Sequence, residues 1–285
     1  ARAVGVLRAS SPAVPDDWHA RMWTVFKEAW ESGSSGDGSV QIHLNASLFK
    51  QGAEPAAMAR GNLELATVSA FAEALRVLRP AWAEVFQKVS DKMDITVLST
   101  LYLGTRQLNL REPRVVRTPA DLKGIKLRMP GTKEWLFLGQ ALGATATPLA
   151  FGEVYLGLKT GTIDAQDNPL PTVRAAKFHE VTRQLVLTGH LVDGLFLVVS
   201  NKVWKSLTPA QQQRMRQAAQ VAARYNNDNR LKEESQLVDY FRQQGLQIQT
   251  PDVAAFRAAV QQAYMQSDYA KVWPSGLLDR INAVR

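Results

Sequence analysis

The chain has 285 residues, 46% of them hydrophobic and 21% charged, which excludes intrinsic disorder and favours two domains over one. It contains no cysteine, which excludes disulfides, thiolate nucleophiles and cysteine-ligated zinc, and no apolar run approaches the roughly 20 residues that span a bilayer, so we expect a soluble protein. The 34 basic and 26 acidic residues give a formal charge of +8, which is compatible with nucleic acid, anionic lipid or acidic solutes as partners.

The first 70 residues alternate between strand-like and helix-like segments. Apolar runs and alternation predict strands at 4–7, 40–44 and 63–68, and helical spacing of apolar residues predicts helices at 16–31 and 54–61. This order is typical of a parallel sheet covered by helices.

The middle of the chain repeats this alternation after an interruption. A helix is predicted at 76–91 and a strand at 95–102, and the basic, proline-containing stretch 104–120 predicts an irregular crossing between domains. The elements predicted beyond it are a strand at 126–129, a helix at 134–142, a strand at 145–147, a helix at 153–160 and a strand at 163–166. The second domain therefore has a parallel sheet of its own.

The last third is dominated by one long helix. Thr208 is a good N-cap, followed by Pro209 and Gln211, and the helical pattern then continues to 244, about 50 Å by helix rise. A helix of that length braces both domains. The shorter elements predicted around it are strands at 184–188 and 195–200 that return toward the first domain, a strand at 246–249, and helices at 250–266 and 277–284.

A search for catalytic or metal-binding sets finds none. The four histidines are scattered without a metal-ligand pair, and no nucleophile elbow, Walker loop or dinucleotide-binding glycine motif is present. The sequence predicts neither an enzyme nor a cofactor or metal site.

One pair of polar residues is suited to binding an anion. Arg128 ends the apolar strand at 126–129, and Asn168 lies forty residues later in a proline-bounded loop. An arginine fork matches a carboxylate through two parallel hydrogen bonds, and a nearby amide can orient the same group. The alternative is a structural salt bridge from Arg128 to Glu153 or Asp167, and the residues alone leave both open.

Neighbouring residues have similarly open roles. Phe151 is either an apolar wall or core, Trp135 either stacks on a ligand ring or packs in the core, and Asp167 accepts from ligand hydroxyls or holds Arg128. The basic stretch from Arg106 to residue 133 raises a nucleic-acid-binding module as a rival, although it lacks interleaved aromatics and any known motif.

Several motifs together resemble the solute-binding proteins of TRAP transporters, the DctP-like family. The matching stretches are 15–19, 61–66, 121–130, 142–144, 151–155, 164–170, 177–181, 188–190 and the long helix after 207. The resemblance covers almost the whole chain. It implies a two-lobed, periplasmic-binding-protein-like α/β fold, each lobe a mostly parallel sheet flanked by helices, with the long helix spanning both.

The resemblance also implies boundaries and site residues. Lobe 1 is expected at 1–104 with the return of roughly 190–215 and parts of the C-terminal region, and lobe 2 at 105–189 with parts of 216–285. The residues that it implies for ligand binding are Arg128 as the carboxylate-binding arginine, Asn168 as its amide, Arg106 as a second arginine, Phe151 as the pocket aromatic, and Ser10 and Ser69 in first-lobe loops. Trp135 and Asp167 are added to this expected site from their residue chemistry.

The function that the resemblance implies is capture of a small organic acid, either a sugar acid or an aromatic or hydroxy carboxylate, for delivery to a TRAP membrane permease. We expect a periplasmic monomer, its signal peptide removed, that binds no nucleic acid and no cofactor. The alternative on the same fold is a ligand sensor for a membrane receptor. The segment at 70–80 departs from the family by being short, which bears on the first-lobe contacts.

Overall fold

The computed structural model describes residues 4–33, 36–70, 87, 90–272, 276 and 279. The strands are Val6–Ser10 (β1), Ser39–His43 (β2), Leu65–Ser69 (β3), Ile95–Leu110 (β4), Lys126–Met129 (β5), Thr145–Pro148 (β6), Ala165–Pro169 (β7), Gln184–Ser200 (β8) and Gln247–Gln249 (β9). The α-helices are Trp18–Ser32 (α1), Glu54–Ala59 (α2), Lys133–Ala141 (α5), Val154–Thr160 (α6), Leu170–Ala175 (α7), Asn201–Ser206 (α8), Pro209–Gln243 (α9) and Val253–Met265 (α10).

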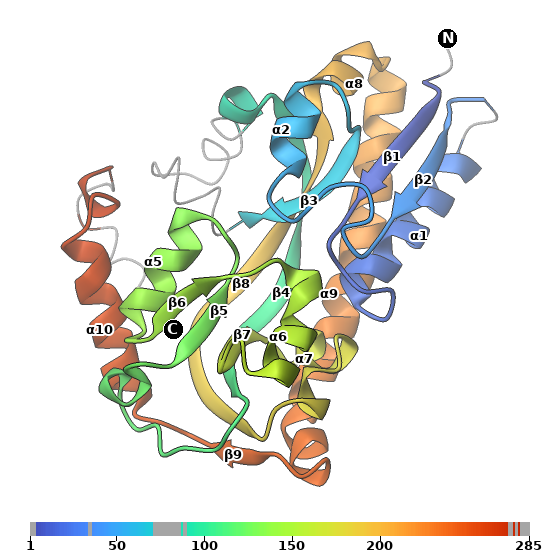
Figure 1. The fold of residues 1–285 in the computed structure, drawn as a ribbon. Helices are drawn as coiled ribbons and strands as arrows, with labels where there is room; N and C mark the ends of the chain where they lie inside the picture. The colour runs from blue at the N-terminus through green and yellow to red at the C-terminus, as the bar shows by residue number, and fades with distance from the viewer. Residues whose placement is uncertain are drawn as a thin grey trace.

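All nine strands found in these ranges form one sheet, in the order β2-β1-β3-β8-β4-β7-β5-β6, with β9 paired to β8. β1 pairs in parallel with β2 and β3, and β5 pairs in parallel with β6 and β7. The long strands β4 and β8 are antiparallel to each other and connect these two groups (Figure 1). The predicted two-lobed α/β fold is confirmed, with lobe 1 built on β1–β3 and lobe 2 on β5–β7. The prediction that the second domain has a separate sheet is wrong, because β4 and β8 join the two parallel groups into one sheet.

The predicted irregular crossing at 104–120 is wrong for its first part, because β4 continues to Leu110. Residues 106–110 pair with β7 on one side and β8 on the other. The register shifts between Tyr102 and Gly104, where the glycine has a φ of +129°. A β-carbon there would lie 2.7 Å from Cβ of Pro169, so both the backbone conformation and the close approach require glycine.

The prediction of two separate strands at 184–188 and 195–200 is also wrong. The structure has one continuous strand, β8, which includes Gly189, Asp193 and Gly194. These three residues interrupt the apolar pattern between the two predicted strands. Hydrogen bonding to β4 continues across most of this length, so pairing with a neighbour, and not local composition, keeps these residues in a strand.

The long helix α9 is confirmed at 35 residues, with the predicted capping box between Thr208 and Gln211. Its early turns place Met215 and Ala219 in the core of lobe 1, and its late turns place Leu237 and Phe241 in the core of lobe 2. Figure 1 shows it running along both lobes. The helix therefore ties the two cores together.

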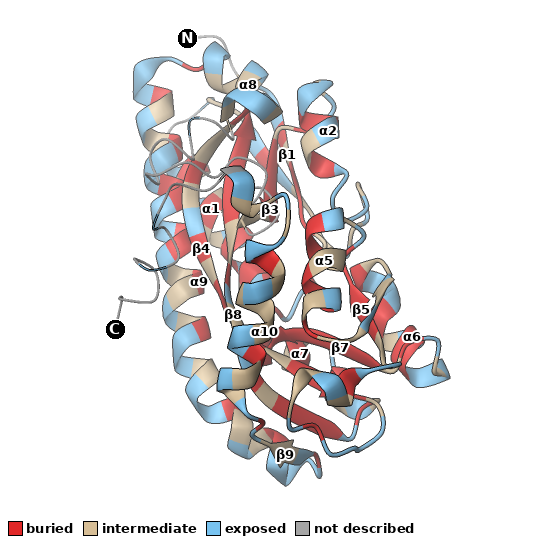
Figure 2. Ribbon diagram, turned by 90° about the vertical axis from the view of Figure 1, so that its left-hand side faces the viewer, coloured by how far each residue is buried: buried red, intermediate tan, exposed pale blue. Residues whose placement is uncertain are grey.

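Burial follows the sheet, whose strands are largely buried while the outer faces of the helices are exposed (Figure 2). Separate apolar clusters fill the two sides of each lobe. Among the described residues, no helix combines the length and the apolar character of a membrane span. The short segment at 70–80 except its first residue, most of the helix predicted at 76–91 and nearly all of that at 277–284 lie outside the described residues.

Candidate functional site

A cavity of about 270 Å³ lies between the lobes. Its walls come from the ends of the parallel strands: Pro12 follows β1, Ser69 ends β3, Pro130 follows β5, and Asn168 lies near the end of β7. The prediction that Ser69 and Asn168 lie in loops is therefore wrong. Crevices at the carboxyl ends of parallel strands are where open α/β sheets bind ligands. The volume is near the lower end of small-molecule pockets, roughly 300–1,000 Å³, and so fits a compact solute.

The structure brings most of the predicted site residues together at this cavity. Those that line it are Ser69, Arg106, Arg128, Trp135, Phe151 and Asn168. Ser10 and Asp167 are fully buried and do not line it. Asp167 lies behind Arg106 and makes its contacts there.

The charge of Arg106 is already matched by protein carboxylates. Its Nε and Nη2 donate to the carboxylate of Asp167 at 2.6 and 3.0 Å, and its Nη1 donates to Asp193 at 2.8 Å. Burial opposes the cation, but the two carboxylates outweigh it and raise the pKa of Arg106. His190 Nε2 lies 3.1 Å from Asp167 on the far side. Arg106 is thus held rigidly, with little charge left for a ligand.

Arg128 is different, because it is buried without a carboxylate partner among the described residues. It is 1% exposed, and only two of its five N–H groups donate within that part of the chain: Nε to Leu149 O at 2.9 Å and Nη2 to Gln51 Oε1 at 3.0 Å. Burial lowers its pKa to about 9, with Arg106 adding to the effect and Asp167 opposing it. The salt bridge to Glu153 or Asp167 that the sequence left open does not form.

The aromatic residues and the amide surround the two guanidinium groups. The Arg106 Cζ lies 4.5 Å from the Trp135 ring centroid, and the Arg128 Cζ lies 5.8 Å from that of Phe151. Trp135 therefore packs in the core of lobe 2 and stacks on an arginine at the same time. Asn168 Nδ2 donates to Gln166 at 2.7 Å, which fixes the amide at the cavity wall.

The sequence reasoning missed several residues that line the cavity. These are Gln51 and Glu54 in and after the turn before α2, Thr132 before α5, Thr172 on α7 and Asp193 on β8. The signal that could have found Gln51, Glu54 and Thr132 is positional, since each closely follows the carboxyl end of a predicted parallel strand or starts the next helix. Asp193 lies inside β8 and has no such signal.

Glu54 is buried at 2% exposure, and burial raises its pKa from 4.5 to about 7. The folded chain holds this proton more tightly than the unfolded chain. Protonated Glu54 therefore contributes fully to the free energy of unfolding below pH 4.5, and this contribution is lost as the pH rises through about 7. We expect Glu54→Gln to remove this loss, so that the variant gains up to about 3 kcal/mol on the wild type between pH 4.5 and 8. Urea unfolding at several pH values measures the free energy of unfolding of both proteins. If it changes with pH in the same way for the variant and the wild type, the prediction is wrong.

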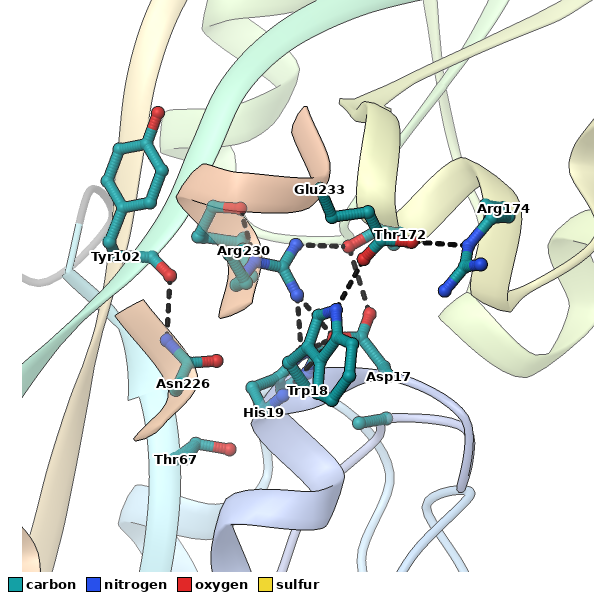
Figure 3. Close-up of polar contacts among 12 residues, drawn as sticks. Asp17, Trp18, His19, Thr67, Tyr102, Thr172, Arg174, Asn226, Arg230 and Glu233 are labelled. Atoms are coloured by element: carbon teal, nitrogen blue, oxygen red, sulfur yellow. Dashed lines mark hydrogen bonds and ion pairs between the residues drawn. The ribbon is translucent and has the colours of Figure 1, made fainter. Parts of the chain in front are cut away.

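Beside the cavity, a buried polar network joins both lobes to α9 (Figure 3). Arg230 of α9 donates to Asp17, which precedes α1, and through Nη2 to Thr172 of α7 at 2.8 Å. Thr172 in turn donates to Asp17 at 3.0 Å, and His19 Nδ1 lies 2.7 Å from the same carboxylate. We call these four residues the clasp. His19 and Thr172 also line the cavity.

A second set of contacts lies one helical turn further along α9. Glu233 accepts from the Trp18 indole N–H in lobe 1 and forms an ion pair with Arg174 in lobe 2 (Figure 3). Arg230 and Glu233 are three positions apart and lie on the same face of the helix. Each therefore bonds to both lobes at once.

Within the basic stretch, Arg106 and Arg128 point into the protein and are 3% and 1% exposed, whereas Arg114, Arg117, Lys123 and Lys133 are exposed. The two arginines expected to bind the ligand are therefore set apart from the exposed basic residues. In the described ranges, no group of three or more His, Asp or Glu side chains is placed to hold a metal ion.

Residues 72–271 match the family model of the bacterial extracellular solute-binding proteins, family 7 (DctP). The chain is 34% identical over 184 residues to the sialic acid-binding periplasmic protein SiaP of Vibrio cholerae, which is 65% of this chain and 57% of SiaP. It is 37% identical over 153 residues to the 2,3-diketo-L-gulonate-binding periplasmic protein YiaO of Escherichia coli, or 53% and 46% of the two proteins. The match thus spans about half the length of these curated relatives.

Solved structures resemble the whole chain. A TRAP periplasmic solute binding protein from Roseobacter denitrificans, with bound 3-deoxy-D-manno-oct-2-ulosonic acid (KDO), is 42% identical, with a TM-score of 0.91 and 99% of each chain covered. A second one from the same organism, with bound L-galactonate, is 25% identical, with a TM-score of 0.83 and coverage of 94% and 95%.

Proposed function

Because the chain belongs to the bacterial extracellular solute-binding proteins of family 7, the solute receptors of TRAP transporters, we propose that it captures a hydroxylated organic acid through Arg128 and delivers it to a TRAP membrane permease. Members of this family are receptors and not enzymes, and they act outside the cytoplasm.

The observation that carries the proposal is the state of Arg128. A buried guanidinium without a carboxylate partner is costly, and a ligand anion removes that cost. Three of its N–H groups have no partner in the described part of the chain, and the residue lines the cavity. Asn168 on the same wall is suited to orient a carboxylate held there.

The ligand class is narrowed by the second arginine and by the relatives. Two carboxylates neutralise Arg106, so the cavity offers one cation for one carboxylate and not a site for a dianion. The Roseobacter proteins are described with bound KDO and L-galactonate. These observations favour a monocarboxylate sugar acid over a dicarboxylate.

We also propose that the lobes divide near residues 104 and 189 and close over the ligand by a hinge motion. Gly104 and Gly189 both have positive φ, and the register of β4 with β8 shifts beside Gly104. Hinges are commonly a few such positions that absorb large backbone changes. Because the ligand touches both lobes, it favours the closed form.

A thermal-shift screen tests the proposal. We expect KDO, L-galactonate or D-erythronate to raise the unfolding temperature, because a ligand at 100 times its Kd adds about 2.7 kcal/mol of stability. Adipate, which has two carboxylates, and glycerol, which has none, are the controls that test whether the site requires a single carboxylate. If no monocarboxylate shifts the transition while adipate does, the single-cation site is wrong.

A further inference from the structure

We infer that Glu54 and Thr132 form a hydroxyl-binding subsite, distinct from the arginine clamp, that selects polyhydroxylated acids over aromatic ones. The inference rests on the proposed function, since it concerns the rest of an acid whose carboxylate Arg128 holds. The subsite is made where a turn of lobe 1 meets the start of a helix in lobe 2.

The two segments face each other across the cleft. In lobe 1, Gln51 of the turn before α2 reaches over to accept from Arg128 Nη2 at 3.0 Å. A β-carbon on Gly52 would lie 4.0 Å from Cγ2 of Thr132 in lobe 2. Glu54, Thr132 and this turn all line the cavity. A ligand held by Arg128 would therefore occupy the same cavity that both residues line.

Glu54 has one oxygen in use and one without a partner. Its Oε2 accepts from the Gly52 N–H at 2.8 Å, which stabilises the turn. Its Oε1 is buried and has no hydrogen-bond partner in the described part of the chain. A buried acceptor is normally paired, and burial also raises the pKa of this carboxyl. The unpaired oxygen fits a donor supplied by a ligand.

Thr132 shows the same pattern from the opposite lobe. It occupies the N-cap position of α5, where a threonine hydroxyl usually accepts from the helix backbone, yet its side chain makes no such bond. Its Oγ1 is buried without a partner among the described residues. A threonine hydroxyl both donates and accepts, so it is free to bond to a hydroxyl of the ligand.

These two groups identify the ligand by its chemistry. A carboxyl oxygen and a hydroxyl match the hydroxyl groups of a sugar acid, each of which can donate one hydrogen bond and accept others. An unsubstituted aromatic acid such as benzoate offers no hydrogen-bond donor, because its carboxylate only accepts. It would leave both oxygens buried and unpaired, which a binding site discriminates against strongly. The open choice between a sugar acid and an aromatic acid is thereby decided for the sugar acid.

Titration calorimetry with KDO, L-galactonate, D-erythronate and benzoate tests the inference on the full chain. The variants are Glu54→Gln, which keeps an oxygen for Gly52 but puts an NH2 group in place of the second oxygen, and Thr132→Val, which keeps the shape but loses the hydroxyl. Glu28→Gln, at an exposed position of α1, is the control. Circular dichroism spectra and unfolding curves show whether each variant is folded.

We expect the tightest hydroxy acid to lose about tenfold or more in affinity with Glu54→Gln and about fivefold with Thr132→Val, the size of single buried hydrogen bonds, and none with Glu28→Gln. Benzoate is expected to bind more weakly than that acid to the wild type. If the hydroxy acids bind but both subsite variants match the wild type, the subsite is wrong and the proposed function stands. Tighter binding of benzoate also overturns the subsite alone, whereas binding of none of the acids overturns both.

Discussion

Replacing Arg128 with methionine is expected to weaken binding of the acid by at least about 2 kcal/mol, or roughly thirtyfold, while the protein still folds. Hydrogen bonds to charged groups contribute about 1.5–3 kcal/mol each, and an arginine fork makes two to a carboxylate. Methionine retains the apolar stem that packs beside Phe151 but offers no donor. Titration calorimetry with the acid that stabilises the wild type most measures the loss.

The same variant separates binding from folding. Burial lowers the pKa of Arg128 to about 9, which means that the folded protein disfavours its charge, so the ligand-free methionine variant is expected to be at least as stable as the wild type. Lys123→Met, which removes an exposed charge from the same region, controls for the net charge and should bind normally. Unchanged affinity in Arg128→Met would refute the arginine clamp.

The sequence predicted the strands and helices whose apolar pattern and boundary residues lie within the segment itself. The strand β5 was predicted with its observed bounds because Ile125, Leu127 and Met129 alternate with basic residues between Gly124 and Pro130. The long helix α9 was predicted from its capping box and helical pattern. The second half of β4 was not, because Arg106 and Gln107 look like loop residues until the carboxylates and strands that pair with them are in place.

The residues of the candidate site also fall into those that the sequence predicted and those that it did not. Arg128 and Asn168 lie near the ends of parallel strands. Their residue types left a carboxylate site and a structural salt bridge both open, and the family resemblance favoured the carboxylate. The partners of Arg106 were not predictable, since Asp193 lies 87 residues away within a strand. Glu54 and Thr132 are ordinary helix-start residues in the sequence, and only the unpaired oxygens in the folded chain distinguish them.

The clasp is the other place where a single residue is expected to have a large effect. Arg230 is 0% exposed and Asp17 is 1% exposed. Burial alone would raise the pKa of the Asp17 carboxyl, but Arg230 and then His19 hold it well below its usual range. The ion pair therefore stabilises the fold at neutral pH, and this contribution is lost in acid as Asp17 takes up a proton.

Replacing Arg230 with methionine is expected to destabilise the protein by about 3–5 kcal/mol at pH 7, because it leaves the buried carboxylate of Asp17 without its cation. Adding Asp17→Asn should recover part of that loss, since two neutral groups replace one unpaired charge and the two substitutions are coupled. Arg224→Met, an exposed position on the same helix, should change the free energy of unfolding by less than about 0.5 kcal/mol.

Urea unfolding of the four proteins at pH 7 measures these differences. Repeating the measurement at low pH tests whether the charge of Asp17 is the cause. Near pH 3, where the wild type begins to lose the contribution of Asp17, the gap between wild type and Arg230→Met should narrow, because the carboxyl of the variant is already protonated. Since the clasp holds Thr172 and His19 at the cavity wall, the same variant should also bind the acid more weakly. A double variant no more stable than Arg230→Met, with a gap independent of pH, would show that packing of the arginine and not its charge holds α9 to the two lobes.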